Sequence, residues 1–114
     1  MLREMLKSKI HRATITETNI NYVGSITIDK RLLLAADILP YEKVQVANVT
    51  NGARFETYAM ETDLEGRVCL NGAAARLGEP GDKIIIMAYG RYPDTEIKDF
   101  EPKVVLVHGD DNRF

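Results

Sequence analysis

The chain has 114 residues, a length that supports one domain with a modest core. Its 15 basic and 17 acidic side chains nearly balance and form no long basic block, so a nucleic-acid partner is not favoured. The sequence contains no apolar window near the ~20 residues of a membrane span, no secretion signal and only one cysteine, so we expect no membrane association and a cytoplasmic location.

Short strand-like runs dominate the chain. Alternation or an excess of β-branched residues predicts strands at 7–16, 25–28, 43–49, 54–62, 67–70, 83–89 and 103–108. Asn51-Gly52 predicts a hairpin with a type I′ turn, because both central residues of that turn need positive φ. Many short strands with frequent turns favour a mainly β fold, a small barrel with a few short helices.

Three helical segments are expected between the strands. Asp29 is a suitable N-cap for a helix at 30–36, and Gly78 follows a second short helix at 72–77 as a typical C-terminal residue. A third helix is expected to begin near Pro93. The polar residues 109–114 are predicted to fray.

Lys9 and His11 lie two residues apart on a predicted strand and therefore share a face. They form either a solvated charged face or a cationic patch that binds an acid substrate. Two histidines and one cysteine do not suggest a metal site, and the chain lacks a glycine-rich loop that would bind a phosphorylated cofactor.

Alternation also places Arg54, Glu56 and Tyr58 on one face of the strand at 54–62. This face is either an ordinary polar surface or a site in which Arg54 binds carboxylate and Tyr58 donates a proton. Thr57 then points to the opposite face, unless the strand contains a bulge.

Asn71 precedes the small residues Gly72, Ala73 and Ala74. These residues form either an ordinary helix start or a carboxylate site, because the first amides of a helix lack internal partners.

Gly24-Ser25 is an ordinary turn dipeptide by itself, but its context is unusual. It combines with Lys9-Ile10-His11-Arg12, the segment 48–52, Arg54-Phe55, Thr57-Tyr58-Ala59 and the segment 71–75. In this order the segments resemble the pyruvoyl-dependent aspartate 1-decarboxylases over nearly the whole chain.

The resemblance implies a double-psi β-barrel and a homotetramer with active sites between subunits. It also implies that the domain 1–114 cleaves itself between Gly24 and Ser25. The Ser25 hydroxyl would attack the Gly24 carbonyl and form an ester. Elimination and hydrolysis would leave a short chain, 1–24, and a long chain, 25–114, that begins with a pyruvoyl group. Gly24 would permit backbone angles that other residues resist.

The implied reaction is decarboxylation of L-aspartate to β-alanine and CO2 through a Schiff base with the pyruvoyl group, for pantothenate and coenzyme A synthesis. No metal or pyridoxal phosphate is implied. Some relatives need a helper protein, so a maturation factor is a candidate partner. The implied roles are proton donation by Tyr58, stabilisation of the Gly24 oxygen by Thr57, carboxylate binding by Arg54 and Lys9, pocket amides at Gly72, Ala73 and Ala74, and support from His11, Tyr22 and Asn71.

Two alternatives to a working enzyme follow from the same residues. Double-psi barrels also serve as binding modules in larger assemblies, and an inactive or uncleaved relative would share the fold.

Overall fold

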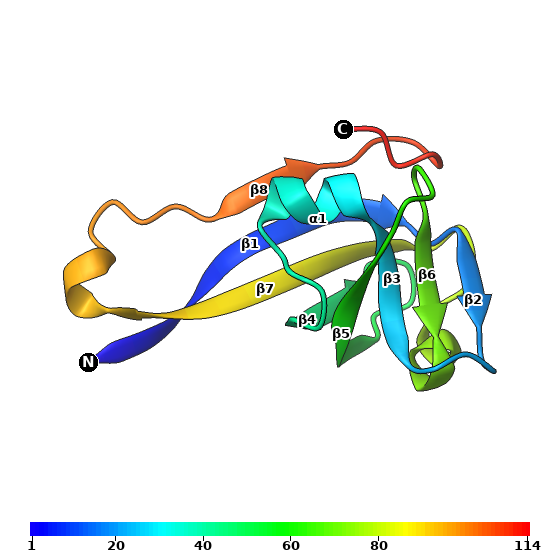
Figure 1. Cartoon of the computed structure of the whole chain (residues 1–114), viewed down its shortest axis with the longest axis horizontal. Coiled ribbons are helices and arrows are strands. Elements are labelled where there is room, and N and C mark those ends of the chain that lie inside the picture. Colours follow the sequence, from blue (N-terminus) through cyan, green and yellow to red (C-terminus); the bar gives the residue numbers. More distant parts are fainter.

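The computed structural model describes residues 1–114 and consists mainly of β-strands, with one α-helix and two short 3₁₀ helices (Figure 1). The strands are β1 (Leu2–Thr14), β2 (Glu17–Asn19), β3 (Ser25–Asp29), β4 (Lys43–Asn48), β5 (Arg54–Thr62), β6 (Val68–Asn71), β7 (Lys83–Pro93) and β8 (Lys103–Leu106). The helices are α1 (Lys30–Ala36), η1 (Gly72–Leu77) and η2 (Asp94–Glu96). The expected mainly β class with few short helices is confirmed.

Hydrogen bonds join the strands in the order β2-β6-β3-β5-β4-β7-β1-β8. Only Ile15 and Thr16 separate β1 from β2, although these strands lie near opposite ends of that order. Ile15 is fully buried, and the Thr16 N–H donates to the Val68 carbonyl of β6 at 2.8 Å. The sheet therefore curls around its core in the manner of a barrel, while the double-psi crossing stays a prediction.

The core lies inside the curled sheet and is aliphatic. Alternation along each strand directs every second side chain inward, and α1 covers an open side of the sheet. Its members include Ile26 and Ile28 of β3, Val44 and Val46 of β4, Ile84 and Ile86 of β7, and Leu32 and Leu33 of α1. No helix in the structure has both the length and the apolar character needed to span a membrane.

Helix α1 begins at Asp29, as predicted, and secures the far end of β3. The Asp29 carboxylate accepts a hydrogen bond from the Arg31 N–H at 2.9 Å and another from the Gly66 N–H at 2.8 Å. Burial acts to raise the pKa of Asp29, but hydrogen bonds from Arg31 and Gly66 outweigh it and lower the pKa below its usual value. The carboxylate is therefore ionised at neutral pH and holds the β3–α1 junction.

The hairpin of β4 and β5 is confirmed, but the predicted type I′ turn is wrong. Residues 49–53 form a longer loop, in which only Gly52 has a positive φ, of +81°. The buried Asn48 organises this loop by accepting hydrogen bonds from the N–H groups of Thr50 at 2.9 Å and Asn51 at 3.2 Å. The Asn51-Gly52 dipeptide alone does not indicate that the side chain of the buried Asn48 determines the conformation of this loop.

Gly78 follows the second helix, as expected, but its φ of −164° is extended and not the left-handed value common after helices. Space explains the glycine better, since an added Cβ would lie 2.7 Å from the Ile15 side chain and 2.9 Å from that of Leu70. The helix itself covers the predicted residues 72–77, as a 3₁₀ helix.

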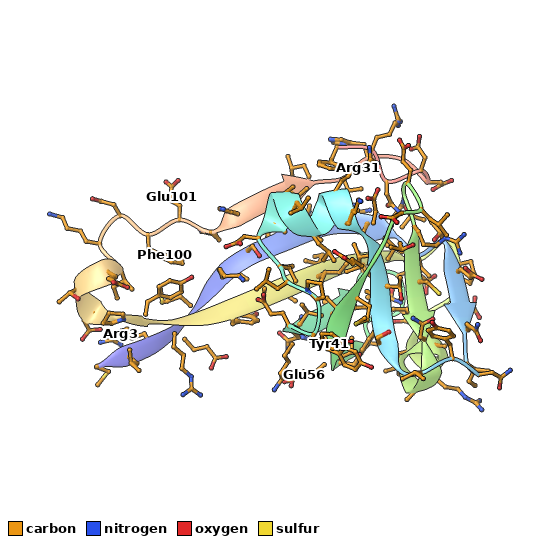
Figure 2. All side chains as sticks on the ribbon, viewed as in Figure 1. Arg3, Arg31, Tyr41, Glu56, Phe100 and Glu101 are labelled. Carbon is orange, nitrogen blue, oxygen red and sulfur yellow. The ribbon has the colours of Figure 1, made fainter.

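Strands β1 and β7 extend beyond the curled part of the sheet as a two-stranded arm (Figure 1). Both strands are longer than predicted, because the arm residues are largely exposed on both sides and show no clear alternation. At its tip Arg3 Nε donates to the Asp94 carboxylate of η2 at 2.6 Å (Figure 2). Tyr92 packs edge-on against Phe100 with ring centroids 4.9 Å apart. Strand β2, also not predicted, is only three residues long.

The predicted fraying of residues 109–114 is wrong. Asn112 is 1% exposed, and its side chain pairs with both backbone groups of Thr14. Asn112 Oδ1 accepts from the Thr14 N–H at 2.7 Å, and Nδ2 donates to the carbonyls of Thr14 and Gly66, each at 2.9 Å. The amide therefore takes the place of a neighbouring strand and ties the C-terminal segment to β1.

We predict that Asn112→Ala lowers the free energy of unfolding by about 2–3 kcal/mol, because it leaves buried backbone groups of Thr14 and Gly66 without partners. Urea denaturation of the uncleaved chain measures this loss. The control is Arg113→Ala, which removes an exposed neighbour and should cost less than about 0.5 kcal/mol. Equal stability of the two variants would show that the C-terminal segment contributes little.

Candidate active site

Ser25 is the first residue of β3, and the bond that precedes it lies where the chain enters the sheet. The incoming segment, 20–24, passes beside η1 (Figure 1). Ser25 is only 2% exposed, and its backbone pairs with that of Asn71 in the antiparallel neighbour β6. The hydroxyl is therefore held inside the structure and not on a mobile turn.

The Asn71 side chain is the polar partner of Ser25. Its Nδ2 lies 3.2 Å from Ser25 Oγ and 2.8 Å from Thr27 Oγ1, and it donates to both. On its other side, Asn71 Oδ1 accepts a hydrogen bond from the Cys69 thiol at 3.2 Å. Because these bonds occupy the side chain, Asn71 does not cap η1. The Asn71 side chain therefore forms hydrogen bonds with Ser25 and its neighbours and none with the start of η1.

Gly72 lies directly against the backbone of Gly24. Its φ of +61° is left-handed, and a Cβ added to it would lie 2.7 Å from the Gly24 Cα and 3.1 Å from the Tyr22 carbonyl oxygen. Gly24 itself is not left-handed, and its own added Cβ would meet only the Asn71 carbonyl oxygen, at 3.9 Å. The expectation that Gly24 needs special backbone angles is wrong. The position that requires glycine is 72.

Strand β5 runs parallel to β3 on its other side. Ile26 pairs with Ala59, so the same register continued by one residue sets Tyr58 beside Ser25. Residues in register share a face of the sheet, which places Tyr58 on the face of Ser25 and Thr27. The Tyr58 ring stacks on that of Tyr41, with centroids 6.1 Å apart and an interplanar angle of 18°.

Thr57 occupies the opposite face of β5. It pairs with Val44, which is 1% exposed, and the β4–β5 register contains no bulge that would turn it outward. As strand alternation predicts, Thr57 therefore lies on the face opposite to Tyr58, although its implied role is to stabilise the Gly24 oxygen. No hydrogen bond joins Thr57 to the Gly24 carbonyl within the single chain.

Arg54 and Lys9 share the outward face with Tyr58 but lie away from Ser25. Arg54 precedes Tyr58 by four residues, about 13 Å along the strand, and donates to Gln45 Oε1 at 3.2 Å. Four strand spacings, about 19 Å along the sheet, separate Lys9 on β1 from β3. Within one chain these cationic groups do not meet the serine.

His11 shares the face of Lys9 on β1, as predicted, since the two residues pair with Leu106 and Val104 of β8. The His11 Nδ1 atom is buried without a hydrogen-bond partner. Because it lies on the same distant strand as Lys9, His11 is not part of the group around Ser25.

A shallow depression of about 300 Å³ adjoins the Ser25–Asn71 pair. Tyr22, Thr27, Cys69 and Asn71 contribute to its lining. At the start of η1, Ala73 is exposed and Ala74 is buried. The structure thus brings together Tyr22, Gly24, Ser25, Asn71 and Gly72, with Tyr58 and Thr57 on the adjacent strand.

Comparison with known proteins identifies the family of the chain. The sequence pattern of the family described as aspartate decarboxylase matches residues 1–114. The chain belongs to the aspartate decarboxylase family. It is 65% identical over 103 residues to an aspartate 1-decarboxylase of Campylobacter jejuni, covering 90% of this chain and 82% of that protein.

Two further members come from other bacteria. The aspartate 1-decarboxylase of Syntrophobacter fumaroxidans is 60% identical over 111 residues, covering 96% of this chain and 90% of that protein. That of Desulfitobacterium hafniense is 59% identical over 113 residues, covering 98% and 89% respectively. The resemblance expected from the sequence is confirmed.

Sequence reasoning missed Thr27 and Cys69, both of which contact Asn71. Strand alternation could have found them, since Thr27 lies two residues after Ser25 and Cys69 two residues before Asn71. The two residues pair with each other across β3 and β6. The cluster of polar side chains around Ser25 therefore includes the next residue pair of β3 and β6, Thr27 and Cys69, which the sequence motifs do not indicate.

We predict that Gly72→Ala destabilises the uncleaved chain by about 1–3 kcal/mol more than Gly52→Ala, because only the first adds a clash to the cost of positive φ. Gly52 is the matched control, since its φ is +81° and nothing lies within 4 Å of its added Cβ. Chemical denaturation of both variants measures the difference. Gly24→Ala should fold normally, and equal losses at 52 and 72 would contradict the close approach to Gly24.

Proposed function

We propose that this chain is an aspartate 1-decarboxylase that converts L-aspartate to β-alanine and CO2, with a pyruvoyl group formed from Ser25 by self-cleavage. The observation that carries the proposal is the buried Ser25 hydroxyl, held by Asn71 beside a tightly packed Gly24 in a chain of this family. The place of the reaction in pantothenate and coenzyme A synthesis, in the cytoplasm, is part of the same proposal.

The competing interpretation is a binding module without catalysis. Family membership over residues 1–114 supports the enzyme, as does the presence of the nucleophile and its polar partner in one buried group.

The proposed cleavage uses groups of the chain itself. Ser25 Oγ attacks the Gly24 carbonyl carbon, the peptide C–N bond breaks and an ester forms. Elimination then removes the Ser25 Cα proton and breaks the bond between Cβ and Oγ, which leaves dehydroalanine at position 25 and releases the Gly24 carboxylate. Water completes the conversion of residue 25 to a ketone and releases ammonia. The hydrogen bond from Asn71 supports this course because it orients Oγ before attack.

The pyruvoyl ketone would supply the electron sink that decarboxylation needs and that no ordinary side chain provides. The residues at its position fit such a group, since Asn71 places a hydrogen-bond donor beside residue 25 and Gly72 leaves room beside Gly24. Tyr58 is the proposed proton donor to the substrate carbon, because the β3–β5 register sets it beside residue 25.

Carboxylate binding is proposed to need a second subunit. Arg54 and Lys9 have the charge for it but lie about 13 Å or more from Ser25 within one chain. A neighbouring copy would bring these cations, and Thr57, to the cleavage site in the homotetramer expected for this family. Gly72, Ala73 and Ala74 would complete the pocket with their amides, and His11 and Tyr22 would shape it.

We predict that the purified chain splits during prolonged warm incubation into fragments 1–24 and 25–114, the larger without an ordinary amino terminus. Denaturing mass spectrometry distinguishes these products. Ser25→Ala should stay whole and inactive, because it lacks the attacking oxygen. A wild-type chain that remains intact would contradict unassisted self-cleavage and favour the need for a maturation factor.

The matched control for this experiment is Ser8→Ala. Ser8 is also fully buried, lies on β1, and its hydroxyl has no hydrogen-bond partner. This variant should cleave at the wild-type rate. Cleavage of Ser25→Ala, or failure of both variants, would remove the specific role of the Ser25 oxygen.

We predict that Tyr58→Phe still cleaves but loses about 10²- to 10⁴-fold in decarboxylation rate, the usual contribution of a positioned proton donor. Release of CO2 from L-aspartate measures the rate. Tyr41→Phe is the control, since Tyr41 stacks on the same ring but is 73% exposed. Full activity of Tyr58→Phe would exclude Tyr58 as the donor.

A further inference from the structure

We propose that Cys69 is a positioning residue for self-cleavage, because its thiol holds the Asn71 side chain in the orientation that presents Nδ2 to the Ser25 hydroxyl. The inference rests on the proposed function, since it assigns Cys69 a task in the attack by Ser25. It concerns a residue that does not touch the bond that breaks.

The four polar side chains of this group lie between two paired strands. Ser25 pairs with Asn71, and Thr27 pairs with Cys69, in the antiparallel ladder of β3 and β6. Cys69 Sγ lies 3.2 Å from Asn71 Oδ1, and Asn71 Nδ2 lies 3.2 Å from Ser25 Oγ and 2.8 Å from Thr27 Oγ1. A continuous series of hydrogen bonds therefore runs from the thiol to the nucleophile.

The two hydroxyl groups do not determine the orientation of the Asn71 amide. A serine or threonine hydroxyl both donates and accepts, so Ser25 and Thr27 could face either the oxygen or the nitrogen of an amide. The sulfur of a protonated thiol is a poorer acceptor than a hydroxyl oxygen, so its contact with the amide favours donation to the Asn71 oxygen. The Cys69 contact therefore decides which end of Asn71 faces the serine.

The surroundings of Cys69 keep this donor available. The side chain is 6% exposed, and burial raises the pKa of its thiol, so the proton is retained at neutral pH. The other nearby acceptor, the Leu70 carbonyl oxygen, is farther from the sulfur, at 3.8 Å. The Asn71 oxygen is the closer acceptor for the single thiol proton.

The orientation matters for the chemistry of Ser25. With Nδ2 facing it, Ser25 Oγ accepts a hydrogen bond, and its own proton and remaining lone pair stay free during attack on Gly24. With the amide reversed, the serine would donate its proton to Oδ1, and the hydroxyl would turn toward Asn71. Loss of the thiol should therefore slow cleavage without preventing it.

The test compares cleavage rates of Cys69→Ala and Cys69→Ser by denaturing mass spectrometry. We expect Cys69→Ala to slow the appearance of the two fragments about three- to ten-fold, the effect of losing one hydrogen bond. Cys69→Ser supplies a hydroxyl that can donate at the same position but can also accept, so it should slow cleavage less than Cys69→Ala does. Equal slowing in both variants, or none in Cys69→Ala, would overturn the proposal.

Val68→Ala is the matched control for a purely structural effect. Val68 is the preceding residue of β6, fully buried in the core and on the opposite face from Asn71. We expect it to lower the melting temperature more than Cys69→Ala does, while cleavage stays within about two-fold of wild type. Slowing in proportion to lost stability in all variants would overturn a specific role for the thiol.

A second measurement does not depend on cleavage. In the Ser25→Ala background, nuclear magnetic resonance of the Asn71 side-chain amide reports its hydrogen bonds in the whole chain. Adding Cys69→Ala should shift these resonances and speed their exchange with water, and adding Cys69→Ser should do so to a smaller extent. Unchanged resonances would overturn the positioning role. A wild-type chain that never cleaves would count against the proposed self-cleavage alone.

Discussion

The close approach of the Asn71-Gly72 turn to Gly24 and Ser25 is the constraint on which the candidate site depends. Asn71 holds the serine hydroxyl from one side, at 3.2 Å. Gly72 then turns the chain with a φ of +61° into η1, so closely under Gly24 that no side chain fits between them. Both sides of one peptide bond are therefore fixed by two consecutive residues. The position of the bond between Gly24 and Ser25 is therefore determined by the end of β6 as well as by the start of β3.

The rest of the fold keeps this contact in place. Strand β3 lies between β5 and β6, and its far end is secured by Asp29 at the start of α1. Gly66, in the loop between β5 and β6, bonds to both Asp29 and Asn112, so the C-terminal segment supports the same region. Figure 2 shows Arg31, at the start of α1, close to that segment. The site thus lies where several elements are joined by hydrogen bonds, away from the β1–β7 arm.

The proposed self-cleavage and substrate binding make different demands on one small chain. The groups around Ser25 are already assembled within a single copy, whereas Arg54 and Lys9 lie on distant parts of the same outward face. This separation is the reason for the proposal that a neighbouring subunit supplies the carboxylate-binding cations. It also explains why a domain of 114 residues can carry an enzyme site without a deep cleft of its own.

Much of the local structure follows from the sequence. The strand residues around Ile26, Val44 and Ile86 alternate or are β-branched, and Asp29 has the short acceptor that a helix start requires. Two of the errors involve buried asparagines whose partners include residues far away in the chain. The loop at 49–53 is organised by the buried Asn48, and the C-terminal segment is held by Asn112, which bonds to residues far away in the chain. Neighbouring residues carry no sign of such bonds.

The order of rare segments in the sequence was sufficient to assign the family and to identify Gly24-Ser25 as the candidate cleavage site, because that information is local. Strand alternation likewise set Tyr58 and Thr57 on opposite faces of β5. Only the tertiary structure decided which residues surround the serine. It placed the requirement for glycine at Gly72 instead of Gly24, and it brought Thr27 and Cys69 to Asn71. These contacts depend on how β3 and β6 pair, and strand register is set by packing of the whole sheet.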